Sequence, residues 1–70
     1  MRKKEEILML RINGKASTIV CGDIYIAARS VGGNATLSKC DADGFCTYTA
    51  VIPQSRIEDF VFILEERAAM

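Results

Sequence analysis

No histidine is present among the 70 residues of this sequence, so few side chains are available for catalytic chemistry. The absence excludes histidine-based acid–base catalysis, serine–histidine triads and histidine metal ligands. A cysteine nucleophile needs a neighbouring cation or base, and only Cys40, which follows Lys39, has one beside it. We therefore expect that the protein is not an enzyme.

The three cysteines, Cys21, Cys40 and Cys46, are typical of small packing residues rather than of a metal site. Zinc takes four nitrogen or sulfur ligands, and the sequence has no CxxC spacing. The segment Asp41-Ala42-Asp43-Gly44 is similar to the start of a calcium loop, but the later oxygen ligands are missing, so it predicts a turn. We expect no metal and no cofactor.

That turn joins two predicted strands, Ala35–Cys40 and Phe45–Ile52, whose pairing is open to two alternatives. If Gly44 takes the left-handed conformation in a three-residue loop, Cys40 faces Cys46 and a disulfide is sterically possible. A pairing shifted by one residue would place more apolar side chains together on one face of the hairpin. That face consists of Ala35, Leu37, Cys46, Tyr48, Ala50 and Ile52. Because register follows the buried pattern, we favour the shifted pairing and three free thiols.

The first strand is predicted over Glu6–Ile12, where apolar side chains alternate onto both faces. Leu8 and Leu10 share one face, whereas Ile7 and Met9 share the other. Asn13-Gly14 follows directly and is a strong signal for a type I′ hairpin. We therefore expect a return strand over Lys15–Cys21.

The segment 24–31 is ambiguous between strand and helix. Ile24, Ala27, Ala28 and Val31 fall at helical spacing, and Gly32 would end such a helix. The branched and aromatic side chains of residues 24–26 are instead typical of a strand, which we favour.

The carboxyl end predicts an amphipathic helix over residues 55–69, after Pro53 stops the last strand. Ser55-Arg56-Ile57-Glu58 has the pattern of a capping box at its start. We expect one α+β domain over residues 1–70, with a flexible amino end at 1–5 and a sheet within 6–52. The expected fold is an antiparallel β-meander of four or five strands followed by this one helix.

The predicted core-facing stripe of the helix is apolar. It consists of Ile57, Phe60, Val61, Leu64 and Ala68. Phe62 points away from that stripe among acidic side chains, and Ile63 also lies outside it. Exposed apolar residues beside one another favour a contact role. Together with Met9 and Ile7 of the first strand, Phe62 and Ile63 are therefore our candidates for a protein interface.

The net charge is zero, but the charges are unevenly distributed. Residues 1–39 carry an excess of four positive charges, and residues 40–70 carry an excess of four negative ones. The basic excess provides candidates for binding a nucleic-acid backbone, with one tyrosine available for stacking on bases. These candidates are Arg11, Lys15, Tyr25, Arg29 and Lys39.

As four strands followed by a helix, the chain resembles the ββββα unit of the Pur-alpha, PC-type coactivator and whirly group of single-stranded nucleic-acid binders. The resemblance covers roughly residues 7–68. Its local support is Asp43–Tyr48, followed by Ile52 and by Ile57–Phe60. It implies a dimer that binds nucleic acid on its sheet.

The expected function is that of a small regulatory, adaptor or inhibitor protein that acts by contact with an unidentified protein and forms a homodimer. A 70-residue chain buries only about 60% of its unfolded surface, so association would add stability. The alternative is a single-stranded nucleic-acid binder of the ββββα type. The apolar run Ile7–Leu10 is too short for a signal peptide or a membrane span, so we expect a cytoplasmic protein without membrane contact.

Overall fold

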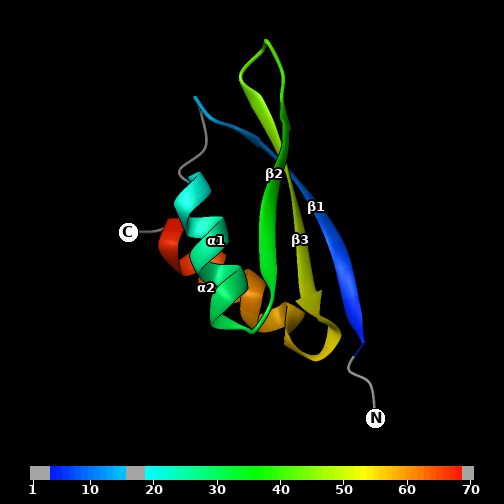
Figure 1. Cartoon of the computed structure of the whole chain (residues 1–70). Coiled ribbons are helices and arrows are strands. Elements are labelled where there is room, and N and C mark those ends of the chain that lie inside the picture. The colour runs from blue at the N-terminus through cyan, green and yellow to red at the C-terminus, as the bar shows by residue number, and fades with distance from the viewer. Residues whose placement is uncertain (1–3, 16–18, 69–70) are drawn as a thin grey trace.

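The chain folds into a three-stranded antiparallel sheet with two helices over one of its faces (Figure 1). The structure is a computed structural model that describes residues 4–15 and 19–68. The strands are β1 (Glu5–Asn13), β2 (Asn34–Cys40) and β3 (Phe45–Pro53), and the helices are α1 (Cys21–Ser30) and α2 (Ile57–Ala68). A 3-10 turn, Gln54–Arg56, joins β3 to α2.

The strand order is β1-β3-β2, so the last strand in the sequence occupies the centre of the sheet. β3 pairs antiparallel with both neighbours, and β1 and β2 consequently run parallel to each other. Parallel strands need a long crossover connection, which contains α1. The expected α+β class is confirmed. The expected meander of four or five strands with a single helix is wrong, because this crossover replaces the strands between the first strand and β2.

Helix α1 occupies most of the segment 24–31, where we expected a strand. Its first turn contains Asp23, whose carboxylate accepts a hydrogen bond from the backbone N–H of Val20 at 3.2 Å. This carboxylate also interacts favourably with the helix dipole. The stripe at helical spacing is buried against the sheet, which outweighs the strand-like character of residues 24–26. It consists of Ile24, Ala27, Ala28 and Val31.

Gly32 and Gly33 end α1 and lead the chain into β2. Their N–H groups donate to the carbonyls of Arg29 at 3.1 Å and of Ala28 at 2.8 Å, which is a Schellman arrangement. Gly32 has a φ of 80°, in the left-handed region that favours glycine. At Gly33 a Cβ atom would collide with the carbonyl oxygen of Val51 on β3. The turn therefore requires glycine at both positions, for different reasons.

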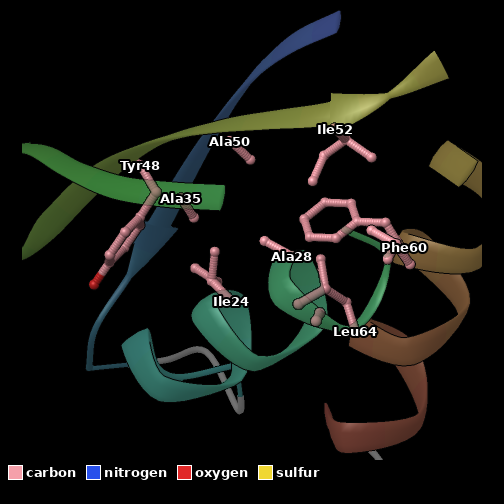
Figure 2. Close-up of a cluster of buried hydrophobic side chains, with 10 residues drawn as sticks. Ile24, Ala28, Ala35, Tyr48, Ala50, Ile52, Phe60 and Leu64 are labelled. Atoms are coloured by element: carbon pink, nitrogen blue, oxygen red, sulfur yellow. The ribbon is translucent and has the colours of Figure 1, made fainter. Parts of the chain in front are cut away.

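The core lies between the two helices and the inner face of the sheet (Figure 2). The buried apolar side chains are Ile24, Ala27, Ala28, Val31, Ala35, Tyr48, Ala50, Ile52, Phe60 and Leu64. Phe60 of α2 and Ile52 of β3 are among the largest that are fully buried, and Figure 2 shows them pointing toward each other. Because four of the ten are alanines, the core gains little apolar area per buried residue.

Asn13-Gly14 turns the chain out of the sheet and does not form the predicted hairpin. The N–H of Gly14 donates to the carbonyl of Gly44 at 2.9 Å, and the N–H of Lys15 donates to Asn13 Oδ1 at 3.0 Å. The asparagine side chain thus stabilises a local turn. The described part of the predicted return strand, residues 15–21, contains a turn and the start of α1 and no strand. Residues 16–18 lie outside the described ranges.

A β-bulge in the hairpin of β2 and β3 combines two pairings that the sequence presents as alternatives. At the loop, Cys40 lies opposite Cys46, and Gly44 has a φ of 93°. The register then shifts between Leu37 and Lys39. Beyond the bulge, Ala35 of β2 is buried opposite Ala50, whereas Leu37 is 46% exposed.

Cys40 and Cys46 are joined by a disulfide, so the expectation of free thiols is wrong for this pair. That expectation assumed one register along the whole hairpin. The bulge allows the cysteines to pair and still places Ala35 opposite Ala50 in the core.

Helix α2 buries most of the predicted stripe, with Ile63 taking the place of Val61. Phe60 and Leu64 are buried as expected, but Val61 is 44% exposed. Ile63, which we placed outside the stripe, is half-buried against the core. The buried side is turned because α2 packs against α1 as well as against the sheet. Ser55 lies in the preceding 3-10 turn, not at the N-cap of α2.

An ion pair joins the two helices, because Arg67 Nε of α2 donates to Asp23 Oδ1 of α1 at 2.7 Å. The Asp23 side chain is 15% exposed. The hydrogen bonds from Arg67 and from the N–H of Val20 hold the pKa of Asp23 below its ordinary value of 3.8, although burial acts in the opposite direction. One carboxylate therefore supports the start of α1 and fixes the end of α2 against it.

The disulfide predicts the thiol count of the unfolded chain. Without reductant we expect alkylation of one cysteine per chain, and of all three after reduction. The double variant Cys40→Ser/Cys46→Ser should be less stable than the oxidised protein by about 2 kcal/mol, because a short crosslinked loop restricts the unfolded chain by roughly that amount. Reductant should destabilise the natural chain and leave the double variant unchanged. Three alkylated cysteines before reduction would contradict the pairing.

The Asp23–Arg67 ion pair predicts an acid-dependent contribution to stability. Because the folded-state pKa of Asp23 lies below 3.8, the contribution is complete above that pH and is lost as the pH falls through the folded-state pKa. Asp23→Asn should therefore lower the urea midpoint at pH 6, and its curve should approach that of the natural chain below pH 3.8. The matched control is Asp59→Asn, which removes an exposed ion pair with Arg56 and leaves both helices joined. A difference for Asp23→Asn that stays constant into acid would contradict this assignment.

Candidate functional site

The side of the sheet that faces away from the helices is here called the open face, and all three strands contribute to it. Leu8, Leu10 and Ile12 of β1 pack toward the core, so the alternate residues of β1 project from the other side. In Figure 1 both helices lie over the core side. The open face consists of Ile7, Met9 and Arg11 of β1, Phe45, Thr47, Thr49 and Val51 of β3, and Thr36, Ser38 and Lys39 of β2.

Ile7 and Met9 form an apolar strip on the open face. Their exposed fractions, 68% and 67%, are the highest among the large apolar side chains in the described ranges. Val51 and Thr49 lie opposite them on β3, and the Thr49 hydroxyl contacts Met9 Sδ at 3.6 Å. Thr49 also shares a 2.6 Å hydrogen bond with Ser38 of β2. The strip is therefore held by regular strand pairing, with hydroxyl groups along its β2 side.

One end of the open face carries charges. Arg11 Nη2 lies 3.3 Å from Asp41 Oδ2, and Lys39 Nζ lies 3.7 Å from Asp41 Oδ1. The Arg11 guanidinium also lies 4.1 Å from the centre of the Phe45 ring. Because the two cations share one carboxylate, this cluster presents a single net positive charge.

The structure brings together only part of the nucleic-acid candidates named from the sequence. Arg11 and Lys39 share the open face, and Lys15 lies in the turn after β1. Tyr25 and Arg29 belong to α1, on the helix-covered side. The Tyr25 ring is half-buried and meets a core tyrosine edge-on at 6.3 Å, so it is not placed to stack on a base at the open face.

Phe62 lies apart from the apolar strip, on α2. Its side chain is 59% exposed. It borders a shallow depression of about 520 Å³, lined by Ile57, Glu58, Asp59, Val61, Phe62 and Glu65. The four interface candidates consequently do not form one surface, because Ile7 and Met9 are on the open face, Phe62 is on the helix layer and Ile63 is half-buried.

The candidate surface also includes three residues that were not predicted as site residues from the sequence, Val51, Thr49 and Asp41. Val51 and Thr49 join it only through the pairing of β1 with β3, which are separated by more than thirty residues in the chain. Asp41 belongs to the surface because the hairpin places its carboxylate beside Lys39. The alternation along residues 45–52 was the one signal that indicated an outward side of β3.

Within residues 4–15 and 19–68, no cluster of three or more cysteine, aspartate or glutamate side chains has the geometry to hold a metal ion. In the same ranges, neither helix has the length and apolar character needed to cross a bilayer. The open face combines exposed side chains of β1 and β2 with half-buried side chains of β3. Comparison of the chain with protein-family models, with curated proteins and with solved structures finds no match.

Proposed function

We propose that the protein is a non-enzymatic contact protein, a small regulator, adaptor or inhibitor that binds a partner protein through the open face and associates with a second copy of itself. The observation that carries this proposal is the apolar strip. Ile7 and Met9 expose about two-thirds of their surface next to each other on the open face. Covering such side chains releases water from apolar surface and favours association.

Self-association is supported by the small core. Four of its ten buried side chains are alanines, and Leu8 and Leu10 at its edge are only half-buried. Folds of this length commonly gain stability from disulfides or oligomerisation. One short disulfide loop restricts the unfolded chain only modestly, so burial against a second copy is a reasonable further source of stability.

A single-stranded nucleic-acid binder is the second candidate, because Arg11 lies over Phe45 on the open face with Lys39 and Lys15 nearby. Two observations favour protein contact over this reading. Asp41 neutralises part of the positive charge, and counterion release from phosphates is the main source of such affinity. The ββββα architecture that suggested nucleic acid is also not the observed one.

Self-association predicts twice the 7.7 kDa mass of one chain in light scattering at about 50 μM, where specific dimers of micromolar Kd are largely assembled. Met9→Glu should favour the monomer, because it places a charge in the strip. The control is Phe62→Glu, a similarly exposed apolar residue on the helix layer, which should leave the dimer intact. A natural chain that stays monomeric at about 0.5 mM would refute self-association. Dissociation by Phe62→Glu alone would place the interface on α2.

The nucleic-acid reading predicts salt-dependent binding of a labelled single-stranded oligonucleotide. Three cations, Arg11, Lys15 and Lys39, would give a slope of log affinity against log salt of about −2. We expect no better than tens of micromolar Kd at physiological salt, the range of non-specific binding. Submicromolar binding at 150 mM salt that is lost in Arg11→Glu would instead make nucleic acid the ligand. Arg29→Glu, on α1, is the matched control.

A further inference from the structure

β1 is an edge strand that lacks two of the features with which proteins block unwanted strand pairing, a bulge and a proline. It is nine residues long, and its register with β3 is uninterrupted from end to end. Its charged residues, Glu5, Glu6 and Arg11, leave the four residues 7–10 between them uncharged. The other edge, β2, is interrupted by a bulge and carries Lys39 beside it. Bulges and edge lysines prevent strand addition, so β1 is the edge that is left open to it.

Two hydrogen bonds that flank the β1–β3 ladder show which backbone groups of β1 point outward. The N–H of Gly14 donates to the carbonyl of Gly44, and the N–H of Gln54 donates to the carbonyl of Lys4. Both pairs continue the register of the two strands. The β1-side members of these two bonded pairs, Gly14 and Lys4, are both even-numbered. Because hydrogen-bonded and non-hydrogen-bonded pairs alternate along an antiparallel ladder, the even-numbered residues of β1 bond to β3. The odd-numbered residues within 5–13 therefore direct their N–H and C=O groups to the free edge.

We propose that β1 pairs antiparallel with β1 of a second copy, which joins two three-stranded sheets into one six-stranded sheet. The inference rests on the self-association proposed above and specifies its geometry. A two-fold axis perpendicular to the sheet relates the copies, so each contributes the same edge. The helices of both copies then lie on one side, and the two open faces become continuous on the other.

Side-chain complementarity selects the register centred on Leu8. With Leu8 opposite its own copy, Ile7 lies opposite Met9 of the second copy. Glu5 lies opposite Arg11 of the second copy, which pairs opposite charges at both ends of the contact. Apolar and opposite-charge pairs across strands are both stabilising. Shifting the register by two residues places Ile7 opposite Arg11, or Glu5 opposite Met9, and loses this match.

The pairing covers groups that one copy leaves exposed. The outward N–H and C=O groups of residues 5, 7, 9 and 11 all find partners, because these positions pair with one another in this register. On the core side, Leu8, which is half-buried in one copy, meets Leu8 of the second copy. On the open face, the two Ile7–Met9 strips become neighbours. The enlarged apolar strip is then the surface offered to the partner protein.

Proline at position 9 tests the edge separately from the face. Met9→Pro keeps an apolar side chain and removes an outward N–H, and it spares every β1–β3 hydrogen bond. We expect the dimer Kd to rise about tenfold or more in analytical ultracentrifugation, with the circular dichroism of the folded chain retained. Met9→Leu, which keeps the N–H, should dimerise normally. If the natural chain dimerises and a folded Met9→Pro variant dimerises equally well, edge pairing is refuted while self-association stands.

A charge exchange tests the register and does not depend on the proline variant folding. Glu5→Arg and Arg11→Glu should each weaken the dimer several-fold, because each places like charges opposite one another. The double variant Glu5→Arg/Arg11→Glu restores opposite charges across the interface and should recover most of the affinity. Failure of the double variant to recover would overturn the register centred on Leu8. A natural chain that never dimerises would instead remove the self-association on which the inference rests.

Discussion

The pairing of β3 with both other strands is the interaction on which the rest of the fold depends. β1 and β2 run parallel with β3 between them, so β3 is the strand with which each of them pairs. This requires the chain to cross over after β1, and α1 is part of that crossover. α2 follows β3 after the short 3-10 turn and packs beside α1, where the Asp23–Arg67 ion pair joins the two helices.

Placing both helices on one side determines what remains for binding. A three-stranded sheet has two faces and two edges, and the helices cover one face (Figure 1). The bulge makes the β2 edge irregular, whereas β1 stays regular and carries the apolar strip. The face and the edge serve different purposes in our proposal. The edge takes a second copy through backbone groups, and the face takes a partner through side chains.

The sequence by itself determined the elements whose signals are local. Alternation predicted three strands to within about one residue at each end, and apolar periodicity predicted the carboxyl-terminal helix. The exposure of Phe62 also followed from its position on the helical wheel. These predictions hold because the strand period, the helix period and the effect of Pro53 on the strand before it depend on neighbouring residues in the chain.

Only the tertiary structure decided the features that depend on what each segment packs against. Residues 24–31 carry both strand and helix signals, and burial of the helical stripe from Ile24 to Val31 under the sheet selects the helix. The bulge at Ser38 allows the Cys40–Cys46 pairing and the burial of Ala35 opposite Ala50 to occur in one hairpin. Ile63 is half-buried because α2 packs against a second helix, which was the less favoured of the two alternatives for residues 24–31. In each case competing local preferences differ by little, and long-range burial of apolar surface decides between them.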